Sequence, residues 1–184
     1  MKSSLQIAQR SPEALAVEFF QQSAGRWRSE RRYYTLRSEE VQEVISLIDI
    51  QVLESDSLDL AHLKQLHKLE EGRPFLGGAK ITWESSYVGP GRKPSMGTTL
   101  FGISGTTLYR DRGFATPKPI TAQFYCPQPR TLCLHTEYNG SVFEEELKLI
   151  GSKYRTRQTV ISRAGEEQTI GQYLEKRLAV SHEQ

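Results

Sequence analysis

The sequence has few cysteines, no metal-binding motif and no long apolar run. Its two cysteines, Cys126 and Cys133, are too few for a disulfide scaffold, and neither has the CxxC or Cys/His spacing of a zinc site. His62 and His67 lie five residues apart on an expected helix, so they do not share a face as a metal pair must. We predict cysteines that pack as small buried hydrophobic residues, and no metal site.

Charge of one sign is not in excess either. The chain has 24 basic and 22 acidic residues, which gives no electrostatic case for binding nucleic acid or a membrane. Nowhere do about 18 apolar residues run together, and the opening MKSSLQIAQR has no apolar core of signal-peptide length. We expect a cytoplasmic protein whose 184 residues form one domain, with flexible ends at 1–10 and 179–184.

Two helices are expected. Ser11-Pro12-Glu13 has the order of an N-cap, a first-turn proline and an acid that compensates the helix dipole, and this helix should end near Gly25. Ser57 can cap a second, short helix with a leucine stripe on one face, for which Gly72 supplies the stop.

The rest of the chain has the pattern of short strands. Residues alternate from Trp27 onward, and a stretch rich in β-branched residues at 41–53 completes a first hairpin. Further runs, separated by Gly, Pro and Asn-Gly turns, lie at 79–88, 95–103, 106–111, 120–125, 131–138, 141–150, 153–162 and 168–177. Eight to ten antiparallel strands predict a mainly β, closed up-and-down barrel able to hold one small ligand, with a β-sandwich as the alternative.

Four residues near the C-terminus form the clearest candidate site. Alternation places Arg155, Arg157 and Thr159 on one side of a strand, and a turn near 150–151 would lay Glu145 against Arg155 or Arg157. Inside a barrel this cluster would be costly to bury, because ionised groups need partners, and a ligand could be one of them. The alternative is a surface cross-strand ion pair that contributes about 0.2–1 kcal/mol.

Five segments carry a resemblance that extends from about Glu18 to Arg177. They are FFQQSAGRWRSERRYYTL at 19–36, Trp83-Glu84, LYRDRGFAT at 108–116, LHTEYNGS at 134–141 and YRTRQT at 154–159. With these segments the chain resembles the S/U-type phycobiliprotein lyases, the chromophore lyases of cyanobacteria and related algae.

The resemblance implies a lipocalin-like barrel that takes up a linear tetrapyrrole (bilin), such as phycocyanobilin, as substrate and needs no prosthetic group. Such a lyase joins the bilin by a thioether bond to a cysteine of phycocyanin β, allophycocyanin or phycoerythrin. Residue by residue, the resemblance gives catalytic roles to Glu145 and Arg155, and bilin contacts to Arg157 and to Thr159, where serine is more usual. Glu145 would accept hydrogen bonds from pyrrole N–H groups, while guanidinium groups would grip the two propionates.

Four further residues are candidates for ligand binding. Only one of Arg28 and Arg31 can face inward, and we favour Arg31 as a propionate partner, with a solvated position as the alternative for either. Trp83 is a candidate wall against a bilin ring, and Trp27 is either a wall or part of the barrel floor.

The resemblance leaves alternatives open. The chain has Glu145-Glu146 where many members have Glu-Arg followed by an aromatic residue, and it lacks a second tryptophan after Trp83. A non-catalytic bilin carrier and one subunit of a heterodimeric lyase are the competing functions, and a homodimer is also open. The cysteines should be dispensable, because the attacking thiol belongs to the acceptor protein.

Overall fold

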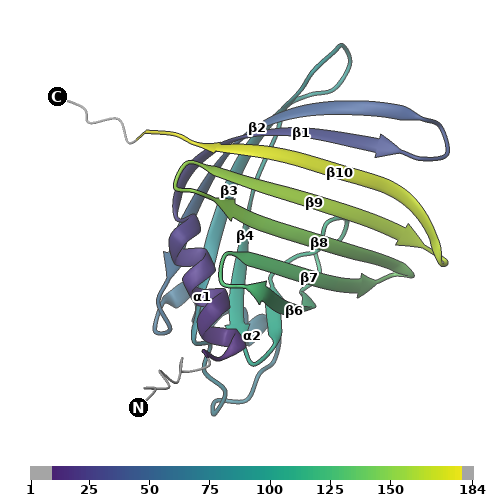
Figure 1. The fold of residues 1–184 in the computed structure, drawn as a ribbon. Helices are drawn as coiled ribbons and strands as arrows, with labels where there is room; N and C mark the ends of the chain where they lie inside the picture. Colours follow the sequence, from purple (N-terminus) through teal and green to yellow (C-terminus); the bar gives the residue numbers. More distant parts are fainter. Residues whose placement is uncertain (1–9, 180–184) are drawn as a thin grey trace, which may run out of the picture.

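Ten antiparallel strands close into one barrel in which each strand pairs with its neighbours in sequence and β1 pairs with β10 (Figure 1). The computed structural model describes residues 10–179. The elements are α1 (Pro12–Ser23), β1 (Gly25–Thr35), β2 (Glu40–Leu53), α2 (Leu58–Leu66), β3 (Gly77–Tyr87), β4 (Ser95–Ser104), β5 (Thr107–Arg110), β6 (Ile120–Gln128), β7 (Thr131–Tyr138), β8 (Ser141–Ile150), β9 (Tyr154–Arg163) and β10 (Glu166–Arg177). The predicted up-and-down barrel with two helices is confirmed, and the β-sandwich is excluded.

The turn chemistry sets most of the register. Asn139 and Gly140, with φ of 52° and 73°, make the tight turn between β7 and β8, as the Asn-Gly pair predicts. Pro127 does not break β6, contrary to the expected break at 127–129. The strand continues to Gln128. Its pairing with β7 is irregular after Tyr125, because proline has no N–H to donate to the ladder.

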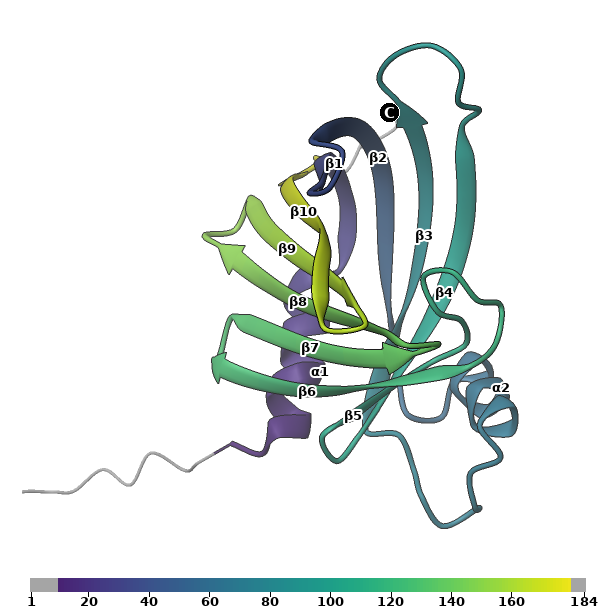
Figure 2. The same ribbon diagram turned by 90° about the vertical axis from the view of Figure 1, so that its right-hand side faces the viewer.

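Helix α1 closes one end of the barrel, where it contacts β2, β3 and β4 on one side and β6 and β7 on the other (Figures 1 and 2). Ser11 caps it as predicted, because its hydroxyl accepts a hydrogen bond from the Ala14 N–H. The last turn of α1 holds no basic residue, but Arg177 of β10 donates to the carbonyl oxygens of Gln22 and Ala24. A cation from a distant strand thus satisfies the orphan carbonyls at the helix end.

Helix α2 packs on the outside of the barrel. Ser57 caps it, and Leu60 and Leu63 are fully buried in a second apolar cluster with Leu53, Phe75, Leu100 and Tyr109. The expected stop at Gly72 is wrong, since the helix ends at Leu66. Lys68 takes the left-handed conformation (φ 52°) and the Leu69 N–H bonds to the Lys64 carbonyl, so the chain turns before it reaches the glycine.

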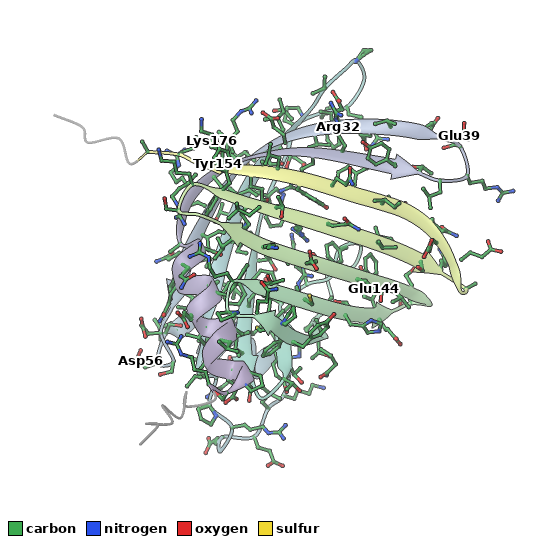
Figure 3. All side chains as sticks on the ribbon, in the orientation of Figure 1. Arg32, Glu39, Asp56, Glu144, Tyr154 and Lys176 are labelled. Carbon is green, nitrogen blue, oxygen red and sulfur yellow. The ribbon has the colours of Figure 1, made fainter. Side chains whose placement is uncertain are left out.

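Strand alternation separates the charged exterior from the interior. Arg32, Glu144 and Lys176 point away from the barrel (Figure 3), whereas the inner face is mostly apolar and merges with Phe19 and Phe20 of α1. Cys133 is buried as predicted, Cys126 is half-buried, and both are free thiols. Burial raises the pKa of both thiols.

The predictions on domain number, chain ends, membrane helices and metal sites can be compared with the structure only in part. We propose that the whole chain forms one domain around this barrel. The ends predicted to be flexible, 1–10 and 179–184, lie almost entirely outside residues 10–179. Within that range no helix is long and apolar enough to cross a membrane, and no cluster of three or more His, Cys, Asp or Glu could hold a metal ion.

Candidate functional site

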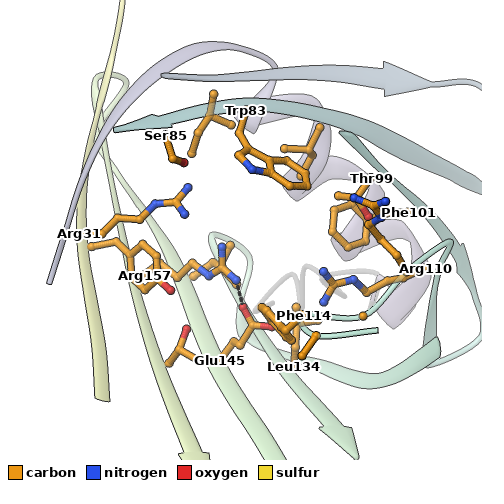
Figure 4. Close-up of a pocket in the computed structure, with 18 of the residues that line it drawn as sticks. Arg31, Trp83, Ser85, Thr99, Phe101, Arg110, Phe114, Leu134, Glu145 and Arg157 are labelled. Carbon is orange, nitrogen blue, oxygen red and sulfur yellow. Dashed lines mark hydrogen bonds and ion pairs between the residues drawn. The ribbon is translucent and has the colours of Figure 1, made fainter. Parts of the chain in front are cut away.

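The barrel interior holds a cavity of about 540 Å³ (Figure 4). This volume falls in the range of about 300–1,000 Å³ that is usual for small-molecule sites. Its walls are largely apolar and aromatic, and α1 contributes Phe19 and Phe20. Five arginines and a single glutamate interrupt this apolar lining, namely Arg31, Arg110, Arg112, Arg155, Arg157 and Glu145.

Glu145 and Arg157 form an ion pair on the cavity wall, drawn as a dashed line in Figure 4. Thr159 is the direct cross-strand partner of Glu145, and Arg157 lies one inward position away on β9. The Arg157 Nη2 donates to one carboxylate oxygen of Glu145. The other carboxylate oxygen, the Arg157 Nε and the Thr159 hydroxyl are buried with no partner in the described chain. Three neighbouring polar groups are therefore free to bind a ligand.

The electrostatics favour the charged form of Arg157. Burial opposes the charge of Arg157, but the Glu145 carboxylate, with smaller help from Tyr173 and Glu175, outweighs it and raises the Arg157 pKa. The Tyr173 ring lies beneath the guanidinium groups of both Arg157 and Arg31, at 5.0 and 5.2 Å from its centroid. Burial raises the Tyr173 pKa, so the ring stays a neutral cation–π partner.

A second ion pair joins Arg155 to Glu175, a residue that sequence reasoning missed. Glu175 is 0 % exposed, its carboxylate accepts from the Arg155 Nε, and the Ser29 hydroxyl donates to it over 3.1 Å. Burial alone would raise the pKa of Glu175, but the attraction of Arg155 is stronger, so the net effect is a lowered pKa. Alternation along β10, which buries Glu175 two residues after Tyr173, is the signal that could have identified it.

The expected convergence of Glu145 with both arginines is therefore only half realised. Glu145 reaches Arg157, while Arg155 lies opposite Leu149 in the β8–β9 register and turns to Glu175 instead. Both arginines still line the cavity.

The four other predicted ligand residues separate into two groups. Arg31 and Trp83 line the cavity, and the Arg31 Nε donates to Ser29 over 3.2 Å. Trp27 is fully buried and is not among the lining residues; its indole N–H donates to the Ser23 carbonyl over 2.8 Å, and the guanidinium groups of Arg155 and Arg177 lie 5.1 and 4.3 Å from its ring centroid. Arg28 does not reach the cavity, because alternation points it outward, where it pairs with Glu30.

Arg110, like Arg112, is a lining arginine that was not predicted as a site residue. It lies in the LYRDRGFAT segment at the end of β5, is buried, and faces the cavity beside Phe101 and Phe114 (Figure 4). The strand pattern alone could have placed Arg110 on the inner face, since Leu108 two residues earlier is buried there.

Comparisons with known proteins agree with this architecture. The sequence profile of a family described as "CpeS-like protein" matches residues 16–178. A Nostoc sp. protein named "Putative phycocyanobilin lyase CpcS 2" is 58% identical over 97% of this chain and 99% of its own length. A Picosynechococcus sp. protein named "Putative chromophore lyase CpcV" is 50% identical over 96% and 87%. The solved S-type phycobiliprotein lyase CpeS of Guillardia theta has the same fold, with a TM-score of 0.76 and 22% identity over 90% of this chain and 94% of its own.

Proposed function

The chain belongs to the CpeS-like family, and we propose that it is a chromophore lyase that takes up a bilin and attaches it to a cysteine of a phycobiliprotein subunit. Its relatives carry the names of phycocyanobilin and chromophore lyases, which favours phycocyanobilin as the substrate. The acceptor is drawn from phycocyanin β, allophycocyanin and phycoerythrin.

The cavity-facing pair of Glu145 and Arg157 carries this proposal. A bilin has pyrrole-type N–H donors, two propionate acceptors and an extended π-system. The cavity offers the free carboxylate oxygen of Glu145 beside the Nε of its partner Arg157, the guanidinium of Arg31 for a propionate, and aromatic walls that include Trp83. The N–H donors, the propionates and the π-system of the bilin thus each have a matching group on the cavity wall.

The attachment chemistry needs position and polarisation more than a protein nucleophile. The acceptor's sulfur forms a bond to the ethylidene carbon of the bilin, the carbon–carbon π bond breaks, and the thiol proton ends on the bilin, with no net oxidation. Glu145 accepts hydrogen bonds from the pyrrole N–H groups and so favours the protonated, more electrophilic chromophore. The cavity holds the bilin in one orientation and shields it from water.

The other lining residues act by contact or by position. Arg31 faces a propionate, Arg157 is held beside the ligand by its pairing with Glu145, and the Thr159 hydroxyl, which has no partner in the described residues, adds one hydrogen bond. Arg155 lines the cavity while its Nε is committed to Glu175, so we assign it a positioning role in place of the catalytic role predicted from the sequence.

The direct test mixes the purified protein with phycocyanobilin and the reduced apo-phycocyanin β subunit, then denatures in acid and measures chromophore retained covalently on the acceptor. Glu145→Gln removes the charge inside the cavity, and Glu144→Gln removes the charge of the adjacent, outward-facing residue on the same strand. We expect Glu145→Gln to slow attachment at least about tenfold, the loss typical of one hydrogen bond to a charged group. Glu144→Gln should match the wild type.

Three outcomes would contradict the proposal. Equal rates for Glu145→Gln and the wild type would remove Glu145 from the chemistry. Bilin binding without any gain over free bilin in rate or selectivity would indicate a carrier. Attachment that appears only after a second lyase subunit is added would indicate one half of a heterodimer.

A further inference from the structure

Arg110 is a buried arginine that faces the cavity without a carboxylate partner. It is 7% exposed, and its Nε has no hydrogen-bond partner. Within residues 10–179 no ion pair involves its guanidinium group. The rings of Phe101 and Phe114 lie with their centroids 4.9 and 4.6 Å from the guanidinium carbon. Both distances are within cation–π range, and Arg110 lines the cavity together with these two rings.

The backbone around Arg110 is held on both sides. The Nε2 of His67, the residue that follows α2, lies 2.8 Å from the Arg110 carbonyl oxygen. The next residue, Asp111, accepts hydrogen bonds from the Leu100 N–H over 2.9 Å and from the Thr99 hydroxyl over 2.8 Å. The side chain is therefore presented at a fixed position on the cavity wall.

The charge of Arg110 is only partly compensated by its surroundings. Burial lowers its pKa, and although Glu145 attracts the guanidinium, Arg157 repels it. Cation–π contacts recover part of the cost of burying a charge, but a carboxylate partner recovers more. A buried guanidinium in this state is suited to an anion that enters with the ligand.

The other cavity arginines differ in whether they have a carboxylate partner. Two of the five pair with buried glutamates, as described above, and Arg112 is exposed. Arg31 and Arg110 remain as the interior arginines without a carboxylate partner in the described chain, and they face each other from opposite sides of the cavity (Figure 4). A bilin carries two carboxylates, which equals the number of these unpaired guanidinium groups.

We propose that Arg110 binds a carboxylate of the ligand and that, with Arg31 opposite, it fixes the two propionates of a bilin. This assignment rests on the proposed function. It adds an anion-binding position at the β5 end of the cavity, on a residue outside the Glu145–Arg157 pair, and so determines the orientation in which the bilin lies in the barrel.

The test compares phycocyanobilin with its dimethyl ester, in which both propionates are uncharged. Both forms are titrated by absorbance into the wild type, Arg110→Gln and Arg32→Gln, the last on the outer face of β1 where it pairs with Glu43. We expect Arg110→Gln to raise the Kd of the free acid by about tenfold or more, as for a lost charge-assisted contact, and that of the ester by less than about twofold. Arg32→Gln should change neither value.

Two results would overturn the assignment. Unchanged binding of the acid by Arg110→Gln, or equal weakening of acid and ester, would mean that Arg110 does not hold a carboxylate. Failure of the wild type to bind either form would remove the proposed function itself. If a thermal melt shows no folded Arg110→Gln, Arg110→Lys serves instead. It keeps the charge without the bidentate fork, and it should weaken binding of the acid several-fold while leaving the ester unaffected.

Discussion

Two buried arginine–glutamate ion pairs in the barrel differ in whether they are saturated with hydrogen bonds; we call Arg155–Glu175 the floor pair and Arg157–Glu145 the wall pair. On the floor, Arg155 and Glu175 form an ion pair whose second carboxylate oxygen is bound by Ser29. On the wall, Arg157 and Glu145 form an ion pair that leaves the second carboxylate oxygen free. The saturated pair contributes to folding, whereas the unsaturated pair has hydrogen-bonding capacity left for a ligand.

The largest expected effect is on the stability of the floor. Glu175→Gln leaves Arg155 buried without its counter-charge, and removing one partner of a buried pair costs about 3–5 kcal/mol. Glu145→Gln should cost about 1 kcal/mol, because the Arg157 side chain is 20% exposed and can be solvated. Urea unfolding followed by circular dichroism gives both values. Equal losses in the two variants would end the distinction between floor and wall.

The contribution of the Arg155–Glu175 pair to the free energy of unfolding should depend on pH. Pairing with Arg155 lowers the folded-state pKa of Glu175 below its ordinary value of 4.5, so its contribution is complete above that pH and is lost as the pH falls through the folded-state pKa. The difference in unfolding free energy between the wild type and Glu175→Gln should be full at pH 7 and shrink below about pH 4.5. Urea titrations between pH 3 and pH 7 measure it, and a difference that grows in acid would contradict the pairing.

A change in the shape of the cavity wall should affect both folding and binding. A Cβ at Gly97 would lie 2.5 Å from the Trp83 ring, so Gly97→Ala must displace the indole that lines the cavity. Overpacking of this kind costs about 1–3 kcal/mol, and we expect bilin affinity to fall by about tenfold. Tryptophan emission reports the displacement, since Trp27, the second tryptophan, is fixed in the floor. Unchanged emission and affinity would mean that the ring does not contact the ligand.

The smallest effect should come from Thr159. Its hydroxyl is buried without a partner among residues 10–179, so Thr159→Val removes an unsatisfied group and should leave stability unchanged or slightly higher. If the hydroxyl binds the bilin, affinity should fall by about threefold to tenfold, the value of one neutral hydrogen bond. Thr136→Val, at another buried hydroxyl without a partner that is absent from the cavity lining, is the matched control.

Much of this molecule follows from local sequence signals. The Ser11 and Ser57 caps, the Asn139-Gly140 turn and the alternation on β8 and β9 all identify their elements, and alternation puts Glu145, Arg157 and Thr159 on one face. Each depends on residues close in the chain, where propensity and geometry act directly.

The partners of the charged groups could not be predicted in the same way. Glu175 meets Arg155 through the β9–β10 register, which depends on an irregularity between Glu167 and Thr169 that no local signal marks. Arg110 becomes significant only once the closed barrel places it across the cavity from Arg31. Ring closure sets these long-range distances, and alternation alone cannot supply them.

The central claim is that the wall pair binds the ligand and the floor pair does not. Its most direct test is the Kd of phycocyanobilin for Glu145→Gln and Glu175→Gln, measured by absorbance titration at a temperature where both are folded and expressed per folded molecule. We predict a Kd raised by about 10-fold to 100-fold in Glu145→Gln and changed by less than about threefold in Glu175→Gln. Weaker binding by Glu175→Gln than by Glu145→Gln would contradict the claim.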